Sequence, residues 1–423
     1  MKLWNLASVL LLPLAGHGAE IRAGVARADL PVGAGVRLSG FAGRRISSGV
    51  HDPLQARVLL LRTATESVAL VACDLHDFQS RRVSEEARRT MNIGTILFAA
   101  SGTHAAPGTA LEGDRSWVPA VEETILGALR QAGSATFAAR FGAGQGTADL
   151  AYNWRMVDPD GVVTMLWRNP ERRATGPLFP GVPVWRIDTQ DGELRVVLFG
   201  ASARASLAGR DNTLLSGDYP GQAARRVEAS LGSGVIALFL QGAAGNLAPR
   251  AGGGSPEHAK QAGEELAGEV VRVARGIQTA VEPNPAVSVQ RTQFEFQERW
   301  GNGRNVPIET ATVVVNRTYA LAALPGAPFV EHQINLADRS PALHTILSAH
   351  TQTANGQWAG ILPTIRAAAQ GGYGASYATR LEPGAGEALV DAALVNIYRV
   401  LGKLDDLPRG SLVREMPPEG RPR

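Results

Sequence analysis

Short apolar runs alternate with longer amphipathic segments in the first part of the chain. Continuous apolar runs predict buried β-strands, and charged residues at helical spacing predict surface helices. In chain order, this pattern predicts strands at 58–62, 68–74 and 95–101, and helices at 80–91 and 118–132. Such alternation is typical of a mostly parallel sheet with helices on its faces.

Turn sequences then change the pattern. The segments 158–161 and 190–192 contain Asp-Gly steps, and the runs beside them predict antiparallel strands at 162–167, 182–188 and 194–200. Further helices are predicted at 221–231, 256–277 and 387–401, and further strands at 235–241, 287–296, 318–324 and 345–348. The sequence therefore predicts an α/β fold of mixed, largely parallel layered sheets with flanking helices. It predicts one compact unit over 20–403, with two lobes that meet near residue 280 as the alternative, and a flexible tail over 404–423.

The N-terminus has the pattern of a secretory signal peptide over 1–19. Lys2 gives a charged start, an apolar run covers 6–14, and small residues stand at 15, 16, 18 and 19. The run is too short to span a bilayer, and no later segment predicts a transmembrane helix. We therefore expect a secreted or periplasmic protein; the alternative for this segment is a buried N-terminal helix.

Composition narrows the function classes. Of 423 residues, 44% are hydrophobic and only 19% are charged, which is enough to bury a large core. Lys plus Arg (42) and Asp plus Glu (39) nearly balance, without runs of like charge, so no nucleic-acid partner is expected. Cys73 is the single cysteine, which excludes an intramolecular disulfide, and its apolar surroundings predict a core residue.

Polar side chains follow several of the predicted strands. Asp74 and His76 follow one strand, His104 follows another, and a glycine-rich loop at 242–249 follows a third. In open α/β sheets, ligands bind outside the carboxyl ends of the strands. These residues are therefore site candidates by position.

A series of short motifs resembles a known family. The motifs lie at 23–29 (AGVARAD), 49–53 (GVHDP), 71–75 (VACDL), 103–108 (THAAPG), 211–212 (DN), 216–221 (SGDYPG), 241–249 (QGAAGNLAP), 324–326 (LPG), 362–364 (LPT) and 371–373 (GGY). In this order, over residues 21 to about 401, they resemble the neutral ceramidases, which are zinc amidohydrolases that cleave the amide of ceramide. The resemblance implies the α/β fold of that family's catalytic domain.

The resemblance also implies where zinc would be bound, and there the residues differ. The family's zinc-binding His, His, carboxylate and Tyr correspond to Gly102, Arg204, Ala327 and Ile361, respectively. A two-residue gap would instead place His104 at the first position. Gly, Ala and Ile carry no side-chain ligand, and Arg stays protonated and repels a cation. We therefore expect no zinc and no other cofactor at these positions.

Arg204 is expected to replace the charge of the ion and to hold a carboxylate or phosphate. The alternative is that Arg204 points to solvent or pairs with Asp218 or Glu228. Four further matched positions are expected to bind substrate: Asn153, Arg155, Asn246 and Tyr373. The alternative for the first two is a polar turn ahead of a hairpin.

Three functions remain open. The first is an exported ceramidase-like pseudoenzyme of lipid metabolism that binds a lipid, amide or anionic ligand in the former active-site pocket. The second is an active hydrolase of an amide-linked substrate, with Asp74, His76 and His104 as catalytic residues of a rebuilt site. Glu331 and His332 would add ligands for a relocated metal, although adjacent side chains of a helix diverge. The third is a purely structural role. The oligomeric state is left open.

Overall fold

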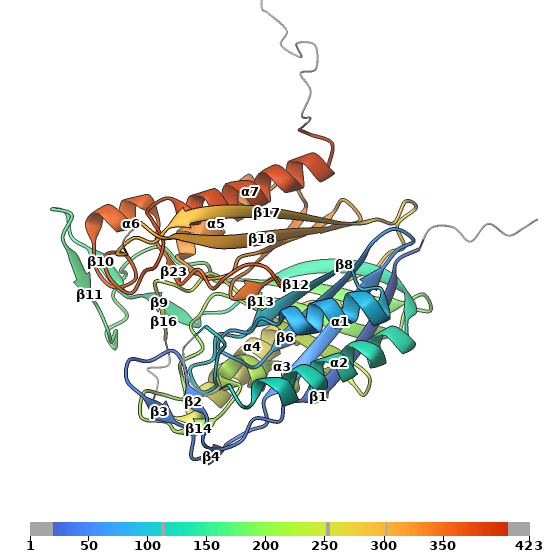
Figure 1. The fold of residues 1–423 in the computed structure, drawn as a ribbon, viewed down its shortest axis with the longest axis horizontal. Coiled ribbons are helices and arrows are strands. Elements are labelled where there is room, and N and C mark those ends of the chain that lie inside the picture. The colour runs from blue at the N-terminus through green and yellow to red at the C-terminus, as the bar shows by residue number, and fades with distance from the viewer. Residues whose placement is uncertain (1–19, 111–114, 251–253, 302, 405–423) are drawn as a thin grey trace, which may run out of the picture.

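The computed structural model describes residues 20–110, 115–250, 254–301 and 303–404 (Figure 1). The predicted signal peptide (1–19) lies outside these residues, as does nearly all of the predicted tail. Among the helices of the described part, none is long and apolar enough to span a membrane.

The larger sheet has nine strands in the order β15-β13-β12-β8-β1-β5-β6-β7-β22. Their bounds are β1 (Arg22–Asp29), β5 (Gln55–Arg62), β6 (Ser67–Cys73), β7 (Thr95–Ala100), β8 (Phe137–Thr147), β12 (Gly181–Thr189), β13 (Leu194–Ala201), β15 (Ile236–Gln241) and β22 (Thr351–Gln352). The pairs β6–β7 and β13–β15 are parallel, and the other pairs of this sheet are antiparallel. The α/β class is confirmed, but the expectation of largely parallel sheets is wrong. Short turns join β5 to β6 and β12 to β13, and such turns can only connect antiparallel strands.

Successive side chains point to opposite faces of this sheet, and each face belongs to a different hydrophobic core. Val58 and Leu60 belong to a core with the helices on one face, and Leu59 and Leu61 belong to a core with a second sheet on the other. The helices on the first face are α1 (Arg81–Met91), α2 (Val118–Ser134), α3 (Asp218–Leu231) and α4 (Pro256–Gly276). Helix α4 begins after a capping serine, since the Ser255 hydroxyl accepts a hydrogen bond from the His258 N–H.

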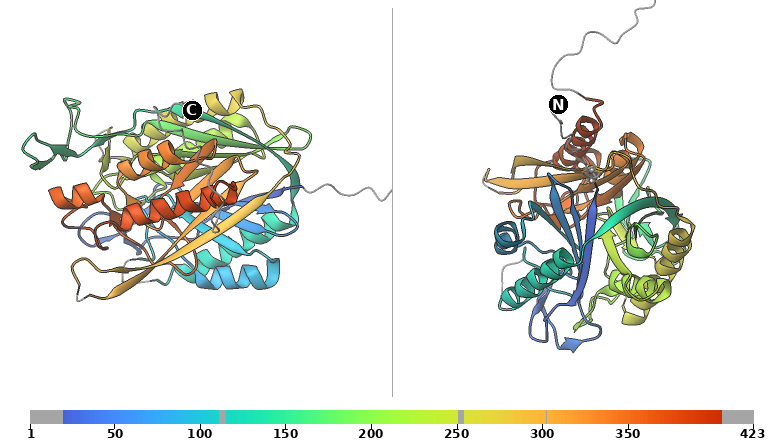
Figure 2. Two further views of the ribbon diagram at one scale, coloured as in Figure 1. Left: turned by 90° about the horizontal axis from the view of Figure 1, so that it is seen from above. Right: turned by 90° about the vertical axis from the view of Figure 1, so that its right-hand side faces the viewer.

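The second sheet has four strands in the order β17-β18-β19-β21. They are β17 (Val287–Gln297), β18 (Asn305–Val315), β19 (Tyr319–Ala323) and β21 (His344–Ser348), and their outer face is covered by α5 (Val330–Arg339) and α7 (Ala385–Val400). The layers thus follow the order helices, nine-stranded sheet, four-stranded sheet, helices (Figure 2).

Small elements complete the loops between the layers. They are β2 (Arg37–Leu38), β3 (Arg45–Ile46), β4 (Gly49–Val50), β9 (Ala151–Asn153), β10 (Arg155–Val157), β11 (Val163–Met165), β14 (Leu214–Leu215), β16 (Leu247–Pro249), β20 (Ala327–Pro328), β23 (Ile361–Leu362) and α6 (Ile365–Gln370). The hairpin β10–β11 projects from one end of the molecule (Figure 1).

Candidate functional site

The loops that follow β6, β7, β15, β19 and β21 meet at one edge of the two sheets. Backbone hydrogen bonds join them: the Ala349 N–H donates to Gln241 O at 2.7 Å, and the Ala100 N–H donates to His350 O at 3.1 Å. This edge therefore carries the polar residues that follow the predicted strands, and it defines the candidate site.

Three histidines gather in these loops. The ring centre of His76 lies 5.6 Å from that of His104 and 5.7 Å from that of His350. Trp358 covers the group, with its ring centre 5.9 Å from His76 and 4.8 Å from His350. His76 and His104 were predicted from the sequence but His350 was missed, although it lies two residues after the predicted strand 345–348.

His76 is oriented by its neighbour Asp77. The Nδ1 of His76 lies 2.8 Å from Oδ2 of Asp77, whose carboxylate also accepts hydrogen bonds from Ala110 N (2.6 Å) and Thr109 Oγ1 (3.2 Å). Burial would raise the pKa of Asp77, but these hydrogen bonds and the charge of His76 hold it below its ordinary value. An ionised carboxylate only accepts, so Nδ1 of His76 donates, and in the neutral form of the ring Nε2 is the nitrogen that accepts.

His350 fills the space beside Gly102. Its Nδ1 donates to the backbone oxygen of His76 at 3.0 Å, because a carbonyl only accepts. A Cβ on Gly102 would meet the ring of His350 at 3.0 Å, and Gly102 has a positive φ of 74°. Burial, followed by the charge of His76, lowers the pKa of His350 to about 3, so its ring is neutral at neutral pH.

His104 is the most enclosed of the three histidines. It is buried, and its Nδ1 has no hydrogen-bond partner in the described part of the chain. Burial first, and then the charge of Arg204, lowers the pKa of His104 well below its ordinary value. A neutral imidazole with an unpaired ring nitrogen is therefore available at the floor of the site.

Asp74, the third predicted catalytic residue, has its side-chain partners on β5 and not among the histidines. Its Oδ2 accepts a hydrogen bond from Gln55 N at 3.0 Å and lies 3.7 Å from Nη1 of Arg57. Burial raises the pKa of Asp74 to about 6. No hydrogen bond or ion pair links the Asp74 side chain to His76 or His104 among the residues described, so its catalytic role stays a prediction.

Arg204 points into the site. Its guanidinium lies over the ring of Trp154, 4.3 Å from the ring centre, and its Nη2 donates to Gly245 O at 3.3 Å. Burial lowers the pKa of Arg204, and the neighbouring Tyr373 partly offsets this. Within the described ranges no carboxylate lies at salt-bridge distance, and neither Asp218 nor Glu228 pairs with it.

Two further donors at the site lack an acceptor. Nε1 of Trp154 and Nη2 of Arg155 are buried without a hydrogen-bond partner in the described residues. Nη1 of Arg155 donates to Gly371 O, and its guanidinium lies 5.5 Å from the ring centre of Phe329. Buried N–H groups are normally paired, so unpaired ones mark a place where a ligand or solvent oxygen would be accepted.

An aromatic panel runs from Arg204 to the surface. Trp154, Trp167 and Tyr373 form a triangle with ring centres 5.5 to 5.8 Å apart, and Tyr377 lies 5.6 Å from Tyr373. Trp154 is 5% exposed, whereas Trp167 and Tyr377 are 55% and 52% exposed. The panel therefore offers an apolar path from solvent to the guanidinium.

The other predicted contact residues hold the backbone. Asn153 accepts a hydrogen bond from Arg155 N at 3.0 Å and donates to Pro177 O at 3.1 Å. Asn246 accepts from Val330 N at 2.8 Å and donates to Glu331 at 2.8 Å. Their predicted contact with a substrate stays a prediction.

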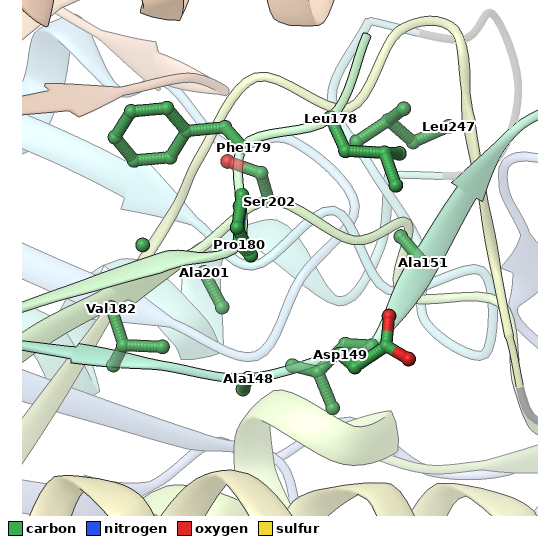
Figure 3. Close-up of a pocket in the computed structure, with 12 residues that line it drawn as sticks. Ala148, Asp149, Ala151, Leu178, Phe179, Pro180, Val182, Ala201, Ser202 and Leu247 are labelled. Carbon is green, nitrogen blue, oxygen red and sulfur yellow. The ribbon is translucent and has the colours of Figure 1, made fainter. Parts of the chain in front are cut away.

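A narrow pocket opens behind the site, between β13, β16 and the segment before β12 (Figure 3). It has a volume of about 20 Å³, enough for roughly one water molecule, and Asp149 is the one charged residue in its lining. A larger hollow of about 270 Å³ lies at the opposite end of the nine-stranded sheet, beside Ile21 and Val281. Neither cavity contains the histidines or Arg204.

Solved structures share this architecture. A ceramidase complexed with C2 superposes with a TM-score of 0.75 over 94% of this chain and 77% of that chain, at 14% sequence identity. The fold is that of a neutral ceramidase. The neutral ceramidase from Pseudomonas aeruginosa gives a TM-score of 0.71 over the same shares, at 15% identity. No family model and no curated protein matches the sequence.

Within this ceramidase fold, the four positions matched to zinc ligands lie around one place. Ala327 and Ile361 are direct partners in the ladder between β20 and β23. Arg204 donates to the oxygen of Gly245, and the backbone at Gly245 lies against Ala327. On the other side, Gly102 packs on the ring of His350, and the His350 N–H donates to Gly326 O. Across the described residues, no group of three or more His, Cys, Asp or Glu side chains is arranged to hold a metal ion.

Proposed function

We propose that this chain is an exported ceramidase-like protein that lacks zinc amidohydrolase chemistry and binds an anionic group of a lipid or amide ligand at Arg204. The observation that carries the proposal is the environment of Arg204. A guanidinium that points into a strand-end site, with no carboxylate partner among the described residues, is suited to an anion from outside. Export rests on the sequence pattern at 1–19.

The donor set at the four matched positions does not fit zinc. Zinc sites in proteins use Cys, His and carboxylate ligands, with water completing the catalytic ones. Gly102, Ala327 and Ile361 contribute none of these, and Arg204 places a fixed positive charge at the same location. We therefore derive no step through a metal.

Three donors support binding of an oxyanion. They are the guanidinium of Arg204, Nη2 of Arg155 and Nε1 of Trp154. Arg204 lies over the ring of Trp154, which contacts Tyr373, and Arg155 donates to Gly371 O in the loop before Tyr373. Carboxylate, phosphate and sulfate oxygens each accept several hydrogen bonds, so one anion satisfies donors that are otherwise unpaired.

The aromatic panel supports an apolar tail on the same ligand. Trp167 and Tyr377 are exposed, and they lead inward to the buried Trp154. Exposed aromatic side chains next to a buried charge suit an amphiphile whose polar end enters first.

Metal analysis and an amidase assay test the missing zinc chemistry. Purified protein should contain far less than one equivalent of zinc, and added zinc should not raise the rate at which it cleaves a fluorescent ceramide. Stoichiometric zinc that disappears in a His104→Ala variant would instead support a rebuilt metal site and would reject this part of the proposal.

Thermal unfolding with dodecanoate below its micelle concentration, and with inorganic phosphate, tests the anion site. Saturating ligand should raise the Tm of the wild type by about 2 to 4 °C. Arg204→Met should abolish the shift, whereas Arg291→Met, at an exposed arginine of β17, should keep it. An equal shift in wild type and Arg204→Met would discard Arg204 as the anion-binding residue.

A further inference from the structure

The pair His76–Asp77 is a feature that neither the sequence motifs nor ligand binding explains. Asp77 is fully buried, and its carboxylate is held by two groups of the following loop, Thr109 and Ala110. A Cβ on Gly108 would lie 2.1 Å from Oδ2 of Asp77, so this loop can pass the carboxylate only with glycine there. The surrounding chain thus fixes the carboxylate at one position.

The carboxylate in turn fixes the imidazole. Nδ1 of His76 donates to Asp77 at 2.8 Å, which leaves Nε2 as a hydrogen-bond acceptor. The ring lies between His104, His350 and Trp358, and the His76 side chain is 14% exposed. This is the arrangement of a general base: one ring nitrogen held by a buried carboxylate and the other free in a site that solvent reaches.

Arg204 lies next to the histidine group. The backbone oxygen of the following residue, Ala205, accepts a hydrogen bond from His104 N at 2.8 Å, and the ring centre of His104 lies 5.6 Å from that of His76. A base and a cation in neighbouring loops are the two groups that hydrolysis of a carbonyl compound requires in the absence of a metal.

We propose that His76, oriented by Asp77, is the general base of a metal-independent hydrolytic site for an ester or amide whose carbonyl oxygen faces Arg204. The inference rests on the proposed anion binding at Arg204 and adds a reaction to it. Asp77 is a positioning residue, and His350 fills the space beside Gly102.

The reaction needs only water as a co-reactant. Water adds to the carbonyl carbon and forms a C–O bond while its proton passes to Nε2 of His76. The π electrons of the carbonyl move to its oxygen, and Arg204 stabilises the negative charge. When the carbonyl re-forms, the C–O or C–N bond to the leaving group breaks, and the leaving group takes the proton from His76. The products are a carboxylic acid and an alcohol or amine.

The test measures hydrolysis of p-nitrophenyl butyrate and of a fluorescent N-acyl amide by the full chain in EDTA. The wild type should exceed the buffer rate, and His76→Gln should lower kcat by about 100-fold or more. The matched control is His51→Gln: His51 also lies beside an aspartate, with its Nδ1 2.8 Å from Asp52, but outside the site. His51→Gln should keep the wild-type rate.

Asp77→Asn separates positioning from folding. It should lower kcat by about 100-fold or more while KM and the phosphate-induced thermal shift stay unchanged. A rate at the buffer level, a rate that His76→Gln leaves intact, or a rate that EDTA abolishes and zinc restores would each overturn the hydrolytic proposal. The thermal shift reports the Arg204 pocket separately, so loss of the shift with hydrolysis intact would reject the binding proposal alone.

Discussion

Two arginine-centred regions of this molecule lie within one fold and are built differently. Under α3, Arg57 donates to Glu228 at 2.8 Å and to Gln55 at 2.6 Å, and Asp74 lies 3.7 Å away. At the strand-end site, Arg204 lies on Trp154, and no described carboxylate pairs with it. Carboxylates of the protein pair with the first guanidinium, whereas among the described residues the second has a carbonyl and an aromatic face as its partners.

The difference separates a structural charge from a functional one. A buried guanidinium with its own carboxylates is part of the folded core, and removing it leaves those carboxylates without compensation. A guanidinium without a carboxylate is kept at a free-energy cost, which a ligand anion can offset. The same substitution at the two sites therefore tests the distinction directly.

The largest effect is expected at the paired site. Arg57→Met should lower the free energy of unfolding by about 3 to 5 kcal/mol, because Glu228 and Asp74 remain buried with less compensation. Urea unfolding of wild type and variant at neutral pH measures the difference. A loss below about 1 kcal/mol would show that this network does not stabilise the fold and would remove the contrast.

A smaller effect is expected from acid at the histidines. The pKa of His350 is about 3 in the folded protein against 6.5 ordinarily, so the unfolded chain takes up this proton first. The contribution of neutral His350 to the free energy of unfolding is fully present above about pH 6.5 and is lost as the pH falls toward 3. Between pH 7 and pH 4 the wild type should therefore lose on the order of 2 kcal/mol more than His350→Gln.

The comparison with His350→Gln is needed because carboxyl groups act in the opposite direction. Burial raises the pKa values of Asp74 and Asp218 to about 6, so their ionisation lowers stability as the pH rises through 6. Both proteins retain these groups, and their contribution cancels in the difference. Parallel urea midpoints for the two proteins across this range would contradict a neutral, half-buried His350.

The smallest effect on stability is expected at the unpaired site. Without ligand, Arg204→Met should change the free energy of unfolding by about 1 kcal/mol or less, in either direction, because no described carboxylate loses its partner when the guanidinium is removed. The same urea experiment as for Arg57→Met provides the measurement. A loss as large as that at Arg57 would place Arg204 among the structural charges.

Much of the fold follows from local pattern, and the exceptions have local causes. Helices such as α1 and α4 were predicted nearly to the residue, because each begins at a capping serine. Strand β8 was missed. Its three glycines, at 142, 144 and 146, leave room for α4 and the segment after it, since a Cβ on Gly142 would meet Gln278 O at 2.5 Å. Glycine is rare within strands, so these glycines, which the close packing requires, lower the β-propensity of the segment and the sequence does not predict the strand.

The candidate site was predicted in part. The prediction that His76 and His104 lie at one edge of the sheet is confirmed, because each follows one of two neighbouring parallel strands, β6 and β7. Asp77 was passed over in favour of Asp74, since sequence alone does not tell which of two nearby carboxylates faces the imidazole. His350 comes from the other sheet, and a contact between two sheets has no signature in the periodicity of either one.

The chain crosses from the first group of layers to the second through the segment 278–286, between α4 and β17. His76 and Arg204 precede this crossing, whereas His350 and Tyr373 follow it. Two separately expressed halves, divided within this segment, would each carry an incomplete set of side chains and an uncovered apolar sheet face. Fragment complementation would then bring back the histidine group and the aromatic panel together, which makes this scaffold suited to a split reporter.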